Sequence, residues 1–315
     1  MSIKLISKHR TELMAIALIW VALYHSYFPI TNKAISFILV KCGYAGASLF
    51  LFLSGFSMFY SYKKDSDYTS FIKKRLLRIL PFCLPLICLN VAINNEIFLD
   101  ALTDAFGLNW LRGVNRTNWY TSVILILYFV TPFYLKMFMG KEKIVTVLTI
   151  SVLVLISILI KNDVWAYCLT NMCLYIEGIY FAYLNDNDIA VNSVMLLALF
   201  ILGWIAMFMM YHFYRNDIQH VCPLILIAPF MLISLGYIVD ILHCVQRSLV
   251  FLGGLSYQFY LLHELVVKML YNNYALLYRP NIHFDWLINI CAFVFAIIMS
   301  WLYKTIIESI LGKIR

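Results

Sequence analysis

Charged residues are scarce in this 315-residue chain. Asp, Glu, Lys and Arg together make up 13% of it, whereas 63% of the residues are hydrophobic. The charged fraction is about half that of an average soluble domain. This composition leaves little room for a soluble domain and predicts an all-α polytopic membrane protein. The chain shows no convincing internal repeat, low-complexity tract or long linker, so residues 1–315 are predicted to form a single domain.

Cysteine motifs and a cleavable leader are also missing. The eight cysteines include no Cys-x-x-C pair and lie mostly within apolar runs, which argues against a disulfide framework and against a metal site. Residues 1–10 are too polar and basic for the core of a signal peptide, so we expect the first apolar segment to be retained. The net charge of +8 comes mainly from basic residues beside apolar segments. That distribution is typical of membrane orientation and argues against nucleic acid as a partner.

Ten segments are apolar enough for a membrane helix, which needs about 20 residues to cross a hydrocarbon core of roughly 30 Å. They cover about 11–30, 43–62, 76–94, 119–139, 143–160, 164–184, 191–212, 219–240, 249–272 and 286–307. Residues 33–42 either form an interfacial helix or belong to the second segment. Most of the 24 Lys and Arg residues fall on the side of the N-terminus, so both termini are predicted to be cytosolic. The polar connection 95–118 then lies outside, as a cap over a cavity or as an ordinary loop.

Ionisable residues within the apolar segments are the first candidates for function. His25 lies 15 positions after Arg10, about 22 Å further along a helix, and it is the one ionisable residue of the first segment beyond its inner end. It is either a functional group inside the membrane or an interfacial histidine near the helix end. His263 lies as far into the ninth segment as His25 lies into the first. We therefore expect the two imidazoles to lie at similar depths in the membrane. Glu264 and Lys268 are spaced to neutralise one another.

The second segment is rich in small residues, among them Gly43, Gly46 and Gly55. Small residues allow two membrane helices to approach closely, and they also allow a ligand to approach the backbone. Close helix packing is the simpler interpretation of this pattern.

A basic run precedes the third segment. Arg75 and Arg78 are three residues apart and therefore share a helix face. Two guanidinium groups at the inner membrane surface suit a phosphate ligand, although positive-inside anchoring to lipid headgroups is the simpler interpretation of the run alone. Pro81 and Pro85 follow, and we expect them to break or bend the helix.

Five stretches, in this order, resemble the membrane-bound acyltransferase-3 family, which acylates cell-surface polysaccharides and related glycans. They are VALYH at 21–25, LFLFLSGF at 49–56, FIKKRLLRILP at 71–81, NWYTSVILILYFVTPF at 118–133 and GGLSYQFYLLHE at 253–264. Each short motif is weak alone, whereas the ordered set spans nearly the whole chain. One position departs from the family pattern: where an Arg commonly precedes the His by eleven residues, this chain has Met14. Arg10, one turn earlier, is the candidate substitute.

The resemblance implies a donor, an acceptor and a set of site residues. The donor is a cytosolic acyl-CoA, acetyl-CoA first of all, and the acceptor is a hydroxyl of a glycan or lipid-linked saccharide at a bacterial inner membrane, with membrane lipids as neighbours and a homo-oligomer possible. The implied roles are as follows: His25, supported by Arg10, is catalytic, as general base or transient acyl carrier; Arg75, Arg78 and Ser54 bind acyl-CoA; Trp119, Tyr120, Glu177, Tyr257 and His263 line the cavity.

Two other classes of function remain open. A transporter or channel would use intramembrane His, Glu and Lys side chains as a proton or ion relay, but the chain shows no inverted repeat. A structural or lipid-binding subunit of an assembly is the third class. Transfer of radiolabelled acetyl groups from acetyl-CoA by the purified protein separates the enzyme from both.

Overall fold

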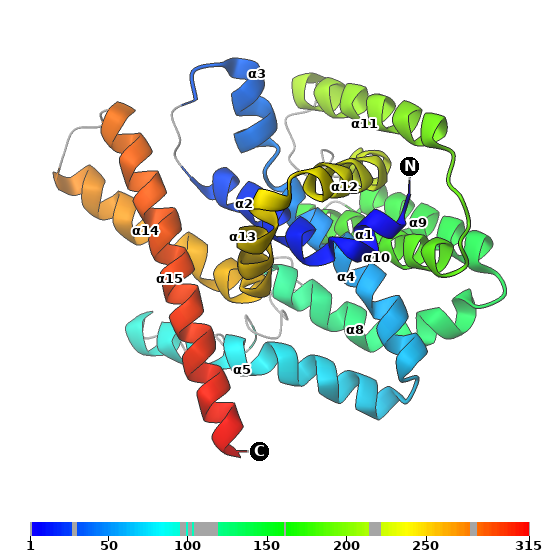
Figure 1. The fold of residues 1–315 in the computed structure, drawn as a ribbon, viewed down its shortest axis with the longest axis horizontal. Coiled ribbons are helices and arrows are strands. Elements are labelled where there is room, and N and C mark those ends of the chain that lie inside the picture. Colours follow the sequence, from blue (N-terminus) through cyan, green and yellow to red (C-terminus); the bar gives the residue numbers. More distant parts are fainter. Residues whose placement is uncertain are drawn as a thin grey trace. The chain divides into compact units, whose positions relative to one another are not determined.

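The computed structural model describes residues 2–26, 30–94, 99, 103, 119–160, 162–213, 222–277 and 282–314. Within these ranges the regular structure is helical throughout, as predicted (Figure 1). Backbone contacts divide the chain into two compact units. The first unit comprises Met1–Lys8 and Ser48–Ile238, and the second comprises His9–Ala47 and Val239–Arg315. Each unit is described by itself below.

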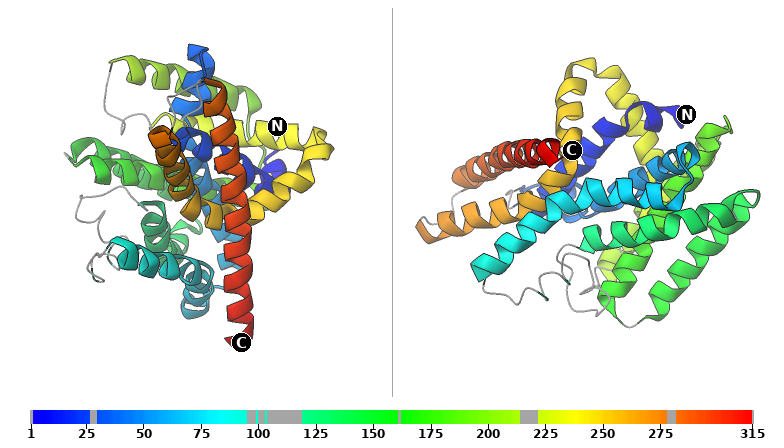
Figure 2. Two further views of the ribbon diagram at one scale, coloured as in Figure 1. Left: turned by 90° about the vertical axis from the view of Figure 1, so that its left-hand side faces the viewer. Right: turned by 90° about the horizontal axis from the view of Figure 1, so that it is seen from below.

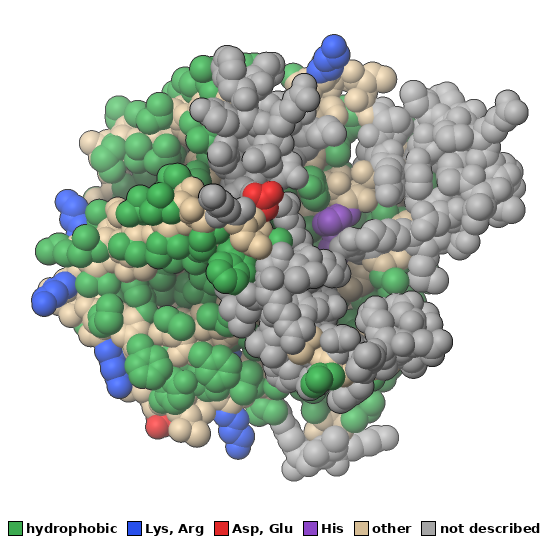
Figure 3. All heavy atoms as spheres, turned by 180° about the vertical axis from the view of Figure 1, so that it is seen from behind, with side chains coloured by type: hydrophobic (Ala, Val, Ile, Leu, Met, Phe, Trp, Pro, Cys, Tyr) green, Lys and Arg blue, Asp and Glu red, His purple; other side chains and the backbone are tan. Residues whose placement is uncertain are grey.

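Long apolar helices dominate the structure. Among the described residues six helices are long and apolar enough to cross a membrane, or seven if one bent pair counts as a single span. The candidate span Lys33–Lys64 includes residues 33–42, but a turn at residues 42–44 separates them from the helix Ala45–Lys64. Both interpretations of residues 33–42 stay predictions. Apolar side chains cover much of the described surface in Figure 3, and Lys and Arg lie at its edge. These features fit an integral membrane protein; ten spans and cytosolic termini stay predictions.

The first unit is a bundle of long helices. It contains α1 (Lys4–Lys8), most of α4 (Ala45–Lys64), α5 (Tyr68–Asn94), α8 (Trp119–Phe138), α9 (Glu142–Leu159), α10 (Asp163–Asp186), α11 (Ser193–Phe213) and most of α12 (Leu224–Ile241). Helices α9 and α10 pack against one another, and α8 contacts α5, α9 and α10. These helices coincide with predicted segments to within a few residues at most ends.

Helices α4 and α10 touch through their backbones. A methyl group added to Gly55 would overlap the carbonyl group of Tyr175, and one added to Gly178 would overlap the carbonyl group of Phe52. Close by, the hydroxyl of Ser48 donates to the amide oxygen of Asn171 at 2.5 Å. The expected role of small residues in close helix packing is confirmed here.

Helix α5 runs through both of its prolines. Pro81 and Pro85 lie inside a single helix of 27 residues, so of the two expected outcomes, a break or a bend, the break does not occur. Figure 2 shows α5 continuing as one cyan ribbon. A proline within a membrane helix is tolerated where neighbouring groups satisfy the backbone that it frees.

The second unit combines the beginning and the end of the chain. It contains α2 (Arg10–His25), α3 (Lys33–Ser36), the π-helix η1 (Phe37–Lys41), α13 (His243–Gly254), α14 (Ser256–Leu277) and α15 (Ile282–Ile314). Helices α14 and α15 lie side by side in Figures 1 and 2. Helix α2 packs against α13 and α14 and is the centre of the unit.

The ninth predicted segment, 249–272, is not one helix. Helices α13 and α14 meet at an angle of 67°, with Leu255 between them. The backbone of Gly253 packs directly on the carbonyl group of Thr11 in α2. This contact holds α13 against α2, and the sequence around Gly253 gives no sign of it. Lys304 of α15 donates to the carbonyl oxygen of Gly254 at 2.9 Å and so satisfies an acceptor at the end of α13. Counting residues from Leu249 therefore does not measure depth along a straight axis.

We predict that Gly253→Ala destabilises the protein because the added methyl group has no space against Thr11. Overpacking of this kind costs about 1–3 kcal/mol. Gly254→Ala is the matched control, since nothing lies within 4 Å of a Cβ at that position, and its effect should stay within about 0.5 kcal/mol. Thermal unfolding of both variants in detergent measures the difference. Equal unfolding temperatures would show that the contact between α13 and α2 does not limit stability.

Candidate functional site

Two histidines from distant parts of the sequence meet in the second unit. His25 is the last residue of α2 and is half-buried, and His263 of α14 is buried. Their ring centroids lie 5.1 Å apart with the planes at 69°. The two residues thus reach the same level, as predicted, although α14 begins only after the break at Leu255.

The imidazole of His263 is fixed by its own helix. Its Nδ1 lies 3.1 Å from the carbonyl oxygen of Phe259 and 2.8 Å from that of Tyr260. Carbonyl oxygens only accept, so Nδ1 carries the proton and Nε2 carries the lone pair of the neutral ring. The ring of Phe259 stacks on the imidazole at 5.6 Å, with the planes at 10°. His263 is therefore a rigid, oriented neighbour of His25.

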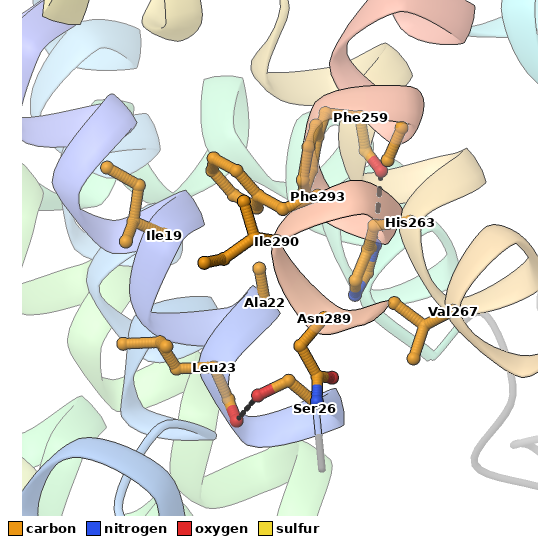
Figure 4. Close-up of a pocket in the computed structure, with 11 residues that line it drawn as sticks. Ile19, Ala22, Leu23, Ser26, Phe259, His263, Val267, Asn289, Ile290 and Phe293 are labelled. Atoms are coloured by element: carbon orange, nitrogen blue, oxygen red, sulfur yellow. Dashed lines mark hydrogen bonds between the residues drawn. The ribbon is translucent and has the colours of Figure 1, made fainter. Parts of the chain in front are cut away.

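A pocket of about 150 Å³ lies beside this histidine pair (Figure 4). Side chains of α2, α14 and α15 line it, with His263 and Ser26 among them. The sequence analysis missed Asn289, a buried amide in α15 that also lines the pocket. A single amide within the otherwise apolar run 286–299 is the signal that could have identified it.

The N-terminal end of α2 holds a second polar cluster. His9 is 3% exposed, and its Nδ1 and Nε2 lie 3.2 Å from Glu12 Oε1 and 2.9 Å from Asp240 Oδ1. Each ring nitrogen of His9 therefore has a carboxyl oxygen as its hydrogen-bond partner. The sequence analysis attached no role to these residues. Arg10, the candidate to replace the family arginine that is missing at position 14, follows His9 in the chain and is half-buried.

The predicted phosphate-binding arginines lie in the first unit. Arg75 is half-buried, donates to the hydroxyl of Ser61 and lies 5.4 Å from the ring centroid of Phe71, whereas Arg78 is exposed. Within the described residues neither arginine has a carboxylate at ion-pair distance. Both guanidinium charges are therefore available to an anion.

Nearby lysines differ from these arginines because carboxylates already neutralise them. Lys63 pairs with Asp186 and Lys74 pairs with Asp65, each at 2.5 Å. The hydrogen bond from Lys74, with a further one from Ser70, lowers the pKa of Asp65 to about 2. Within the basic run, Lys74 is thus paired with a carboxylate, whereas no ion pair within the described residues involves Lys73, Arg75 or Arg78.

Hydroxyl groups gather in the interior of the first unit. Ser54 Oγ and the hydroxyl of Tyr120 are 3.4 Å apart, and the hydroxyls of Thr131 and Tyr175 are 2.6 Å apart. Trp119 begins α8 and its ring packs edge-on against Tyr167, with centroids 4.9 Å apart.

The predicted site residues fall into both units. The first holds Ser54, Arg75, Arg78, Trp119, Tyr120 and the buried Glu177, and the second holds Arg10, His25, Tyr257 and His263. The connection 95–118, apart from residues 99 and 103, and the side chains of Glu264 and Lys268 lie outside the described residues. Among the residues that are described, no group of three or more His, Cys, Asp or Glu could hold a metal ion.

A family model with the description "Acyltransferase domain" matches residues 13–305. The match includes both histidines, both arginines and all five motifs of the sequence analysis. No curated protein and no solved structure matches the chain.

The difference in burial predicts different reactivity of the paired histidines. Diethyl pyrocarbonate should modify His25 faster than His263, because His263 is 2% exposed and one of its nitrogens is bonded to backbone carbonyls. Exposed His243 and buried His9 serve as fast and slow references. Peptide mass spectrometry after timed labelling measures the four rates. Faster modification of His263 than of His25 would reverse their assignment as reactive group and fixed neighbour.

Proposed function

The chain belongs to the acyltransferase-3 family, and on that premise we propose that it transfers an acyl group from a cytosolic acyl-CoA to a hydroxyl of a cell-surface glycan or lipid-linked saccharide. The family match over residues 13–305 carries the assignment to acyl transfer. Acetyl-CoA is the first donor to test, and a bacterial inner membrane is the proposed location. Membrane lipids are then the surrounding partners, and a homo-oligomer is compatible with this assignment.

His25 is the proposed catalytic group. As general base, its imidazole takes the proton of the acceptor hydroxyl while the oxygen attacks the thioester carbonyl carbon. The new C–O bond forms, the C–S bond breaks, and the proton passes to the CoA thiolate. As acyl carrier, the imidazole would instead attack the thioester itself and pass the acyl group on to the hydroxyl. The ring centroids of His25 and His263 are 5.1 Å apart. This contact supports either role because His263 is a polar ring with a fixed orientation beside His25.

Arg75 and Arg78 are proposed to bind the phosphates of the donor. Two uncompensated guanidinium groups form the charge-assisted, forked contacts that phosphate oxygens accept. Ser54 and its neighbour Tyr120 offer hydroxyls that suit the amide groups of the pantetheine arm, and Trp119 and Tyr120 are proposed to shape an outer mouth. Arg10 is proposed to support His25, and Tyr257 is proposed to line the cavity.

Buried Glu177 favours the rival function, a proton or ion relay. Its side chain lies in α10 at 9% exposure, and Oε2 has no hydrogen-bond partner among the described residues. Intramembrane carboxyl groups of this kind mark relays in transporters. Acyl transfer gives a role to the histidine pair, as the catalytic group and its neighbour, and to Arg75 and Arg78, as donor-binding groups. We therefore prefer it to a relay. Incubation of the purified protein with radiolabelled acetyl-CoA and a glycolipid extract tests it, and absence of labelled product would favour the relay.

We predict that removing either arginine weakens donor binding. A charge-assisted hydrogen bond contributes about 1.5–3 kcal/mol, so Arg75→Ala or Arg78→Ala should raise the KM for acyl-CoA about tenfold or more. Lysine should rescue only partly because the fork is lost. Lys73→Ala, an exposed charge of the same helix, is the control for general electrostatics. Unchanged donor KM in the double alanine variant would leave the arginines as membrane anchors.

We predict that His25→Ala and His25→Gln still insert and bind donor but lose nearly all transfer. Loss of a general base lowers turnover about 10²–10⁴-fold. Glutamine keeps polarity and approximate size but cannot take up the proton, so it separates hydrogen bonding from proton transfer. Single-turnover transfer and donor binding, measured on the same preparations, give the two quantities. Wild-type turnover in His25→Gln would exclude both the base and the carrier role and would make His263 the next candidate.

A further inference from the structure

A chain of hydrogen bonds inside the first unit leads to the guanidinium of Arg75. Thr131 Oγ1 donates to the carbonyl oxygen of Leu127 at 2.5 Å, and this bond uses the only hydrogen of that hydroxyl. The hydroxyl oxygen of Tyr175 lies 2.6 Å from the same Oγ1, so Tyr175 is the donor of the second bond. The lone pairs of the Tyr175 oxygen therefore stay available to accept.

The Tyr175 hydroxyl suits a guanidinium and does not suit an anion. Arg75 of α5 lies close enough to Tyr175 and Tyr128 to interact electrostatically with both. Tyr175 belongs to α10 and is 1% exposed. Because its hydrogen is already bonded to Thr131, its oxygen can only accept, and an acceptor beside Arg75 favours the positive charge. Tyr175 is therefore a neighbour that holds Arg75, and a phosphate would gain nothing from it directly.

Ser61 holds the same guanidinium from a different helix, α4. Its Oγ accepts from Nη2 of Arg75, and the ring of Phe71 lies 5.4 Å from the guanidinium carbon. The Nε–H of Arg75 is buried and has no hydrogen-bond partner within the described residues. A buried donor without a partner is unfavourable, and a phosphate oxygen of a ligand would satisfy it. The contacts from three helices thus restrict the guanidinium and leave it one buried donor for a ligand.

We propose that Tyr175 and Ser61 are positioning residues for the donor: they hold the Arg75 guanidinium in the orientation in which its Nε–H meets a phosphate oxygen of acyl-CoA. The inference rests on the proposed function of Arg75 and adds two residues that act through it. A long arginine side chain loses conformational freedom when it binds a ligand, and contacts that restrict it beforehand reduce this loss. Without either contact, Arg75 should bind the donor more weakly although its charge is unchanged.

Steady-state transfer by the full-length protein in nanodiscs tests the proposal, with a glycolipid extract as acceptor and either acetyl-CoA or S-acetylpantetheine as donor. S-acetylpantetheine carries the same thioester but no phosphate. Tyr175→Phe and Ser61→Ala should each raise the KM for acetyl-CoA about three- to tenfold, the effect of one hydrogen bond, with kcat unchanged. Neither variant should change kcat/KM for S-acetylpantetheine. Ser61→Thr keeps the hydroxyl and should retain most of the donor affinity.

Tyr134→Phe is the matched control. Tyr134 is a buried tyrosine of α8 whose hydroxyl lies 3.4 Å from a threonine hydroxyl, and no interaction within the described residues joins it to Arg75. This variant should leave the KM for both donors unchanged. Adding Tyr175→Phe to Arg75→Ala should raise the KM for acetyl-CoA no further than Arg75→Ala alone, because the tyrosine acts through the arginine.

Three results would overturn the inference and leave the proposed function intact, given a raised KM in Arg75→Ala. They are an unchanged KM in either Tyr175→Phe or Ser61→Ala, additive effects of Tyr175→Phe and Arg75→Ala, and an equal loss with S-acetylpantetheine, which would make the role structural only. An unchanged KM for acetyl-CoA in Arg75→Ala would instead overturn the donor-binding role of Arg75 and this inference together.

Discussion

A polar group inside an apolar helix bundle is stable only when its hydrogen-bonding capacity is used, and the second unit is arranged around this constraint. The break between α13 and α14 leaves carbonyl groups at the end of α13, and Lys304 of α15 donates to one of them. The imidazole of His263 meets the same requirement by donating to carbonyls of its own helix. Hydrogen bonds to backbone carbonyl groups therefore hold both the break and the imidazole of His263 in place.

The first unit meets the same constraint in a different way. Its closest packing is the backbone contact between α4 and α10, where Gly55 and Gly178 leave no space for a side chain. Polar groups beside this contact bond to one another, as Ser48 does to Asn171. Among the basic residues near α5, Lys63 and Lys74 pair with carboxylates, while Arg75 and Arg78 have no carboxylate at ion-pair distance within the described residues. Tight packing and an uncompensated charge thus occur together in this unit.

Much of the fold and part of the site were predictable from the sequence. Hydrophobic runs located the helices because span length is set by the bilayer. The two histidines do meet, but the residue count that predicted similar depths assumed a straight helix through Leu255, which the structure does not have. The break at Leu255 was not predictable, since it depends on the contact of Gly253 with Thr11, more than 200 residues away in the chain. The pocket was also hidden, because three helices distant in sequence form it. Spacing placed Arg75 and Arg78 on one face, but their unequal burial depends on Ser61 of another helix.

The histidine pair is suited to moving a single proton. His263 keeps its Nδ1 proton on the carbonyls of Phe259 and Tyr260, so Nε2 is its remaining basic atom. Under the proposed function only one proton has to move, because the proton that leaves the hydroxyl is the one that the thiolate finally receives. One general base, His25, beside a fixed imidazole is sufficient for that step.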